Sequence, residues 1–233
     1  MGIKAQVSIA HKLGFTSHQN AGPLLRELIL HNESEETFQD LTLHLRTAPA
    51  VLEDKKWNID RLLPGTSLDI RDRDVKLNAE WLAELTESVL CEVTLSLRQG
   101  EEELFIAHYP LEALAKNEWG GSAMIELLPS FIIPNDPAVD RVLKATSDVL
   151  RRAGKEDAHD GYKSKSRTRV WEIASALWTA VCNLNISYAL PPASFERNGQ
   201  KIRTPGAILE GKVATCLDTT LLFASALEQI GLN

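Results

Sequence analysis

The sequence predicts two domains: an all-β, immunoglobulin-like sandwich followed by a mainly helical α+β domain. Residues 1–118 alternate between apolar and polar side chains, as do strands with one buried and one solvated face. From about residue 136 the apolar residues instead recur with the period of amphipathic helices. The 233 residues are 44% hydrophobic and 24% charged, which is ordinary for a globular protein long enough for two domains.

Seven short segments of the first domain have the alternating pattern of strands. Turn signals separate them, among them Pro64-Gly65. About seven short strands in about 110 residues fit a sandwich of immunoglobulin-like size, although alternation does not give the connectivity. The expected strands are AQVSIA (5–10), LLRELILHN (24–32), DLTLHLRT (40–47), WNIDRL (57–62), TSLDIR (66–71), VLCEVTLSLRQG (89–100) and ELFIAHY (103–109).

Residues 119–135 form the expected connecting segment. Gly120-Gly121 marks the boundary, and Trp119 is expected to anchor the junction. Six apolar residues in the segment favour a docked connection over a loose linker, because they would be buried. They are Met124, Ile125, Leu127, Phe131, Ile132 and Ile133.

Residues 136–233 begin with helix signals. Asp136 is a suitable N-cap, Pro137 suits the first turn and Gly154 suits the C-terminal cap. A second helix is expected over 169–184, where Trp171 and Trp178 share one face and are expected in the core or a domain interface. One apolar face of the first helix is expected to comprise Val139, Val142, Leu143, Thr146 and Leu150, and Cys182 and Cys91 are expected as small buried residues.

Charge and cysteine usage narrow the function classes. A net charge of -7 argues against direct nucleic-acid binding through overall charge. The loop 151–169 is locally basic, and it is expected to be a solvated loop or else a contact for nucleic acid or an acidic partner. Three scattered cysteines without a CxxC pair give no metal site, and no cofactor is expected. Without a secretory signal or a membrane-spanning run, the chain is expected to be cytoplasmic.

The stretch GKVATCLDTTLLFASALEQIGLN (211–233) carries the one candidate nucleophile. Thr215 is a fair N-cap, and Cys216 is expected in the first turn of a helix that runs to about Ile230 and ends at Gly231. The positive end of a helix dipole stabilises a thiolate, which is the attacking species. The alternative is a structural cysteine near a helix start.

The same stretch resembles the nucleophile segment of the transglutaminase-like superfamily, in which a small residue, Cys, any residue and Asp precede a helix. On that resemblance Cys216 is the nucleophile, and Thr215 and Asp218 are associated with the motif. Nearly the whole chain also resembles the N-terminal region of large bacterial multidomain proteins that continue into a superfamily 1 DNA or RNA helicase, a family of unknown function. Its blocks here are HQNAGPLLRELILHN, NEWGG, IPNDPAV, DGYKS, PPASFERNGQKIRTP and ATCLDTTLLFASALEQIGLN.

The resemblance implies a catalytic order of Cys, then His, then Asp, with the last two after the cysteine helix. All six histidines precede Cys216, and recruiting His159 would require a rearranged order. Residues 136–233 are therefore expected to be a truncated transglutaminase-like domain, inert alone, whose partner is the helicase part of the parent chain. Whether the intact protein is a hydrolase or acyltransferase stays open. The alternative is a non-catalytic interaction module for a DNA or RNA helicase, with a protein partner bound through the sandwich. The remaining histidines are His11, His18, His31, His44 and His108.

Overall fold

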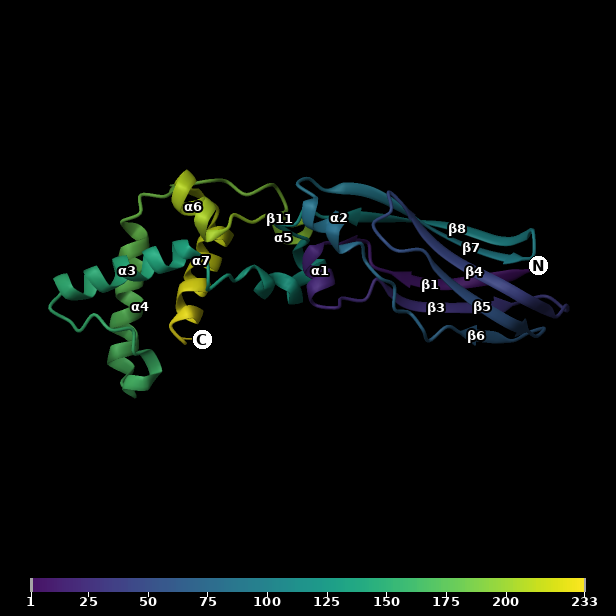
Figure 1. Ribbon diagram of the computed structural model, residues 1–233, viewed down its shortest axis with the longest axis horizontal. Helices are drawn as coiled ribbons and strands as arrows, with labels where there is room; N and C mark the ends of the chain where they lie inside the picture. Colours follow the sequence, from purple (N-terminus) through teal and green to yellow (C-terminus); the bar gives the residue numbers. More distant parts are fainter. Residues whose placement is uncertain (1, 233) are drawn as a thin grey trace. The chain divides into compact units, whose positions relative to one another are not determined.

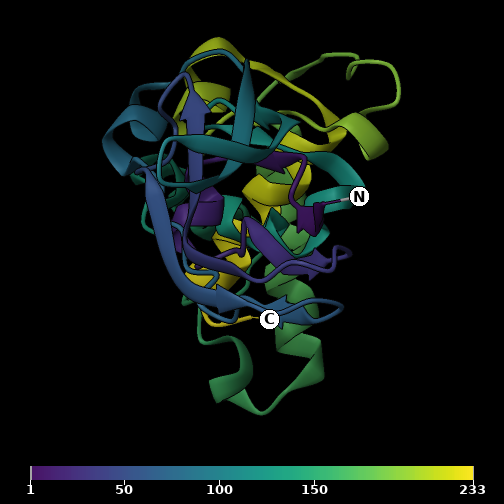
Figure 2. The same cartoon turned by 90° about the vertical axis from the view of Figure 1, so that its right-hand side faces the viewer.

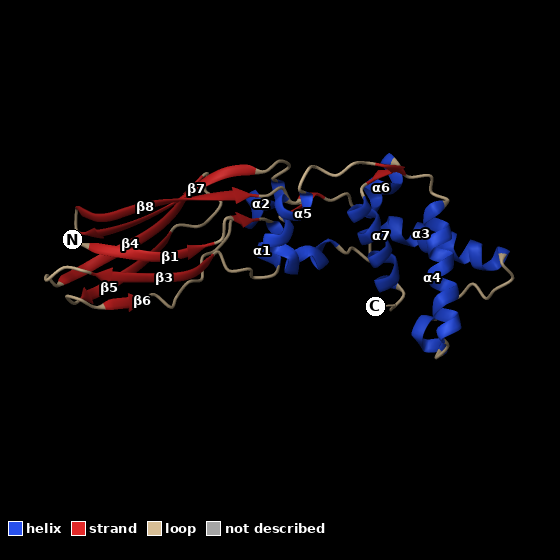
Figure 3. Ribbon diagram, turned by 180° about the vertical axis from the view of Figure 1, so that it is seen from behind, coloured by secondary structure: helices blue, strands red, loops and turns tan. Residues whose placement is uncertain are grey.

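The structure is a computed structural model that describes residues 2–232 (Figure 1). The chain divides into two compact units, Met1–Gly120 (unit 1) and Gly121–Asn233 (unit 2). With secondary structure assigned for residues 2–232, the chain is 36% helical and 31% strand. Strands dominate unit 1 and helices dominate unit 2, but each unit contains both (Figure 3).

Unit 1 contains two sheets. One has the order β1-β3-β6 and the other the order β2-β8-β7-β4-β5. All neighbours are antiparallel except β2 and β8, which run parallel. The elements are β1 (Ile3–Ile9), β2 (Lys12–Leu13), α1 (Phe15–Gln19), β3 (Leu25–Asn32), β4 (Phe38–Ala48), β5 (Lys55–Leu62), β6 (Ser67–Asp69), α2 (Ala79–Glu84), β7 (Val89–Gln99), β8 (Glu102–Ala113) and β9 (Glu118–Trp119).

The core of unit 1 follows the alternation of its strands. In β4, Leu41, Leu43 and Leu45 are buried, and the register places Leu43 opposite Trp57 of β5 and Leu97 of β7. Because side chains alternate between the faces of a strand, these residues share one face of the sheet. Each expected strand overlaps an observed one, so the period-two signal is confirmed for these segments.

The expected fold class is nevertheless wrong. The chain is a mixed α/β protein with a sheet curled into a half-barrel, and not a clear all-β immunoglobulin-like sandwich followed by a helical domain. Long strands of 11 and 12 residues, such as β4 and β8, accumulate the right-handed twist that curls a sheet (Figure 2). Alternation reports which face of a strand is buried, but it carries no information on curl. The helices α1 and α2 have five and six residues, too few to show a helical period in the sequence.

Unit 2 is built mainly from helices that pack on one another. Val142 of α3, Leu177 of α4, Ile208 of α6 and Leu222 of α7 belong to one buried cluster. The elements are η1 (Gly121–Phe131), α3 (Pro137–Arg152), η2 (Gly161–Ser164), α4 (Arg167–Cys182), β10 (Ser187–Tyr188), α5 (Phe195–Asn198), β11 (Gln200–Lys201), α6 (Pro205–Gly211), β12 (Val213–Ala214) and α7 (Cys216–Gln229). Within residues 2–232, no helix is both long enough and apolar enough to cross a membrane.

Helix α3 has the ends and the face that its sequence predicts. The Asp136 side chain accepts a hydrogen bond from the Ala138 N–H, Pro137 is the first helical residue, and Gly154 follows the helix with a φ of +67°. The apolar face Val139, Val142, Leu143, Thr146 and Leu150 is buried throughout.

In α4, a core position for Trp171 and Trp178 and the burial of Cys182 are wrong expectations. Trp171 and Trp178 are 73% and 63% exposed, so they lie outside the core, and Trp178 stacks on the ring of Phe223. Cys182 is exposed at the last residue of the helix, whereas Cys91 is buried as expected. The face that α4 buries lies on the opposite side of the helix from the two tryptophans and comprises Arg169, Ile173, Ala176, Leu177, Ala180 and Val181. Ala176 and Ile173 share a buried cluster with Leu150 of α3, so small and medium side chains, and not the tryptophans, make this contact.

Candidate functional site

The chain forms a capping box at the start of α7. The Thr215 hydroxyl accepts a hydrogen bond from the Asp218 N–H at 3.1 Å, and the Asp218 carboxylate accepts one from the Thr215 N–H at 2.8 Å. The helix begins at Cys216, as the sequence predicts. Because reciprocal caps fix where a helix starts, this pair holds the position of Cys216.

The Asp218 side chain is fully buried and has three donors. Besides the Thr215 N–H it accepts hydrogen bonds from the Arg203 backbone N–H at 2.8 Å and the Arg203 guanidinium at 2.9 Å. A buried carboxylate needs such compensation, since an unpaired buried charge is costly. Asp218 therefore ties the start of α7 to the segment 202–204 between β11 and α6, and its role is structural support of the cysteine.

Gln200 supports the same cap from β11. Its side-chain amide donates to the Thr215 hydroxyl at 3.0 Å, and the residue is 3% exposed. The side-chain oxygen of Gln200, Oε1, is buried and has no hydrogen-bond partner within the described residues. Thr215 is thus bonded on both sides, by its own helix and by Gln200.

Tyr188 is the side chain that approaches the cysteine. Its hydroxyl lies 3.6 Å from the Cys216 sulfur. The short parallel pairing of β10 with β12 places Tyr188 opposite Ala214, two residues before Cys216. The hydrogen bond to Cys216, assisted by desolvation, raises the pKa of Tyr188, so the phenol keeps its proton at neutral pH and can donate to the sulfur.

Two backbone donors remain free beside the sulfur. The first four N–H groups of a helix have no intrahelical acceptor. Here the capping box satisfies those of Thr215 and Asp218, while those of Cys216 and Leu217 have no acceptor among residues 2–232. Both Cys216 and its neighbouring N–H groups therefore lie at the positive end of a 14-residue helix. The arrangement offers a nucleophile together with donors for an anionic oxygen.

No histidine completes this site within the described residues. His159 instead makes a side-chain contact with Ser147 of α3 at 3.2 Å. Desolvation, with the positive charge of Arg169, lowers the pKa of His159 below its ordinary value of 6.5. Within residues 2–232, Tyr188 is the one hydrogen-bond partner of the Cys216 sulfur, while the Thr220 hydroxyl donates to the Cys216 backbone oxygen at 2.8 Å.

The basic loop between α3 and α4 is organised around one buried arginine. Arg169 is 8% exposed and donates to the carboxylates of Asp160 and Glu172 and to the carbonyl oxygens of Glu156 and Ala158. The hydrogen bonds from Arg169 hold the pKa of Asp160 below its ordinary value. Arg169 is therefore a structural centre of the loop, and it is not displayed to a polyanion.

The structure brings the three sequence-derived residues together at one helix start, with Cys216 exposed and Thr215 and Asp218 buried. Tyr188, Gln200 and the free N–H groups were missed. The Thr-x-x-Asp spacing could have revealed the capping box, whereas nothing in the sequence indicates that Tyr188 lies beside Cys216. Within residues 2–232, no three His, Cys, Asp or Glu residues are placed to hold a metal ion. No family model matches the chain, and no curated protein matches it.

Proposed function

We propose that Cys216 is the nucleophile of a cysteine-dependent acyl-transfer site in a transglutaminase-like module. The observation that carries the proposal is an exposed thiol at the first residue of α7, with the Tyr188 hydroxyl 3.6 Å from its sulfur. The superfamily resemblance of residues 215–233, with Cys216 followed by Asp218, supports the same assignment. The resemblance also supports a place for this module in a larger helicase-like bacterial protein of the cytoplasm.

Each group has a role in acyl transfer. The Cys216 thiolate attacks the carbonyl carbon of an ester or amide, a sulfur–carbon bond forms, and the bond to the leaving group breaks. The N–H groups of Cys216 and Leu217 donate to the carbonyl oxygen as it becomes negative. Because a thiolate can only accept, the Tyr188 hydroxyl 3.6 Å away is the donor of that contact, and it holds the sulfur beside the N–H groups. Thr215 and Asp218 fix the helix start that positions all of them.

The chain alone is expected to accept an acyl group without turning over. Loss of a poor leaving group requires a general acid, and release of the acyl group requires a base that activates water. Neither a histidine nor a carboxylate is hydrogen-bonded to Cys216 within residues 2–232. An activated ester needs no acid for its leaving group, so it is the suitable probe.

Iodoacetamide labelling followed site by site in the native chain tests the proposal. Cys216 and Cys182 form a matched pair, since both are exposed but lie at opposite ends of their helices. A helix end contributes about 0.3–1 kcal/mol to a nearby charge, favourable for a thiolate at the N-terminus and unfavourable at the C-terminus. The two ends therefore differ by about 0.6–2 kcal/mol, so Cys216 should label about threefold to thirtyfold faster than Cys182. In denaturant the ratio of the two labelling rates should approach one. In the native chain, Tyr188→Phe should slow the labelling of Cys216 and leave that of Cys182 unchanged. Equal native rates would favour the alternative, a non-catalytic interaction module.

A further inference from the structure

Strand β5 forms an open edge in unit 1. It is the last strand in the order β2-β8-β7-β4-β5 and pairs with β4 alone. The segment 76–78 covers the chain just before it, through hydrogen bonds from Glu53 to Lys76 and from Asn78 to Val51, both 2.9 Å. Between Lys56 and Arg61 the described residues provide no backbone partner beyond β4. A strand edge of this kind is a template for another strand.

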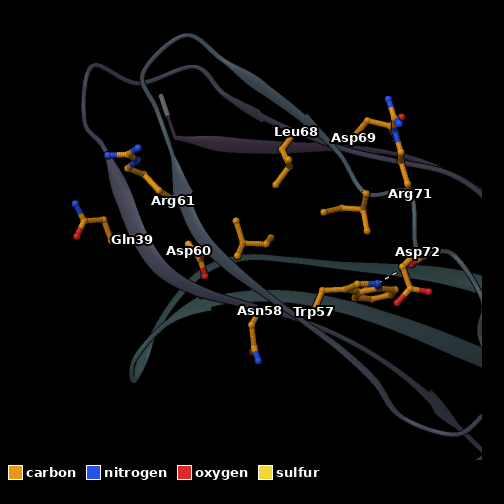
Figure 4. Close-up of a pocket in the computed structure, with 11 residues that line it drawn as sticks. Gln39, Trp57, Asn58, Asp60, Arg61, Leu68, Asp69, Arg71 and Asp72 are labelled. Atoms are coloured by element: carbon orange, nitrogen blue, oxygen red, sulfur yellow. Dashed lines mark hydrogen bonds between the residues drawn. The ribbon is translucent and has the colours of Figure 1, made fainter.

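A groove of about 730 Å³ opens beside this edge (Figure 4). Its lining includes Trp57 and Ile59 of β5 together with Leu68 and Ile70 from the β6 region. Trp57 points toward Asp72, whose backbone oxygen accepts its indole N–H at 2.7 Å, while Asn58 points to the other side of the strand. The apolar side chains of β5 thus face the protein interior, and the polar side chains that alternate with them are exposed on the opposite face of the strand.

The exposed side chains of β5 place a positive and a negative charge at equal distances along the strand on either side of Asn58. Lys56, Asn58 and Asp60 are exposed on one face, whereas Trp57 and Ile59 between them are buried. Within residues 2–232 neither Lys56 nor Asp60 forms an ion pair; in contrast, Lys55 is paired with Asp72 at 2.7 Å. Asn58 lies midway between one positive and one negative charge, neither of which forms an ion pair with a residue between 2 and 232.

The geometry points to a homodimer in which β5 pairs antiparallel with β5 of a second copy, about a two-fold axis at Asn58. In that register Lys56 lies opposite Asp60 of the second copy, and Asp60 lies opposite its Lys56. Opposite charges directly across an antiparallel pair are stabilising and like charges are destabilising. A two-fold interface uses the same surface of both subunits, so the pairing satisfies both charges twice.

Alternative registers lack this match. If the two-fold axis passed through Trp57 or Ile59, Lys56 would no longer lie opposite Asp60 of the second copy. If the two strands instead paired parallel and in register, Lys56 would lie beside Lys56 of the second copy, and the like charges would repel. The end pair of the favoured register sets Arg61 opposite Lys55, but Lys55 is already neutralised by Asp72. The open length from Lys56 to Arg61 fits a short ladder before segment 76–78 intervenes. So small an interface predicts a weak, concentration-dependent dimer.

Sedimentation equilibrium of the 233-residue chain tests the inference, with a reducing agent present because Cys182 and Cys216 are exposed. The average mass should rise from monomer toward dimer between roughly 1 μM and 1 mM. Asp60→Lys sets two lysines opposite each other, and Lys56→Asp sets two aspartates opposite each other. Each should raise the dimer dissociation constant by about tenfold or more.

The doubly substituted chain, Lys56→Asp with Asp60→Lys, restores opposite charges and should dimerise within about threefold of the original. Glu101→Lys in the exposed turn between β7 and β8 makes the same charge change as Asp60→Lys and should have no effect. Circular dichroism confirms that each variant is folded. The inference is overturned by a chain that stays monomeric, which would leave the edge to a strand of another protein. It is equally overturned if the single substitutions leave the dimer dissociation constant unchanged, or if the doubly substituted chain dimerises no better than the single variants.

Discussion

Replacing Asp218 by alanine should destabilise unit 2 more than any ordinary surface change. The Asp218 carboxylate is fully buried, and it accepts from the Thr215 N–H, the Arg203 N–H and the Arg203 guanidinium. Alanine removes all three acceptor contacts and leaves the buried Thr215 N–H without an acceptor. It also leaves half of the capping box at α7 unmade, because the Asp218 side chain is its second arm.

The magnitude follows from these contacts. The buried Thr215 N–H left without a partner, which is the lost arm of the capping box, costs about 1–3 kcal/mol, and the lost hydrogen bond of the Arg203 N–H costs about 1 kcal/mol. The Arg203 side chain is 41% exposed, so its ion pair adds at most about 0.5 kcal/mol. Relief of the buried charge offsets part of the sum. We expect a loss of about 2–4 kcal/mol in the free energy of unfolding.

Urea unfolding followed by circular dichroism and by tryptophan fluorescence measures this loss. The chain has two compact units, so the transition of unit 2 is assigned through Trp171 and Trp178 of α4. Glu210→Ala is the matched control, because Glu210 is an exposed helical carboxylate with no ion pair in the described chain. It should change stability by less than about 0.5 kcal/mol. A loss below about 1 kcal/mol for Asp218→Ala would refute the reasoning.

Three further predictions concern unit 2 and Cys91. The fold lowers the pKa of His159 and so favours the neutral imidazole; the stability that this residue contributes is complete above about pH 6.5 and is lost as the pH falls through the folded pKa. An NMR titration of His159 should give a midpoint below 6.5. In His159→Gln the free energy of unfolding should fall less steeply as the pH is lowered below 6.5. Burial raises the pKa of the Cys91 thiol, so Cys91 should label only as fast as unit 1 opens, and rapid native labelling would contradict its burial. Arg169→Ala should increase amide hydrogen exchange over 155–166, because the carboxylates of Asp160 and Glu172 and two backbone oxygens of the loop lose their donor. Unchanged protection over 155–166 would show that Arg169 does not hold the loop in place.

The elements that the sequence predicts well are those whose signals are local. Alternation located the long strands such as β4 and β7, since burial of one face is written into neighbouring residues. Caps located α3, because Asp136, Pro137 and Gly154 act on the backbone beside them. For the same reason Thr215 and the start of α7 could be placed to the residue.

The features that the sequence did not predict depend on distant residues. Tyr188 reaches Cys216 across 28 positions through a two-residue parallel pairing, which leaves no periodic signal. Trp171 and Trp178 were misplaced because hydrophobic side chains were assumed to be buried, although a helix that packs through alanines can expose its tryptophans. The curl of the sheet arises from twist summed over several strands, and no single segment records it.

Site-resolved acylation of the native chain tests the central claim, that Cys216 is an acyl-accepting nucleophile, most directly. The chain is mixed with an activated p-nitrophenyl ester at neutral pH, and peptide mass spectrometry follows acyl groups on Cys216 and Cys182 while absorbance follows released p-nitrophenol. The account predicts one rapid equivalent of p-nitrophenol, an acyl group on Cys216 ahead of Cys182, no sustained turnover, and loss of the burst in Cys216→Ser. A burst that survives in Cys216→Ser, or acylation of Cys182 at the same rate as Cys216, would contradict it.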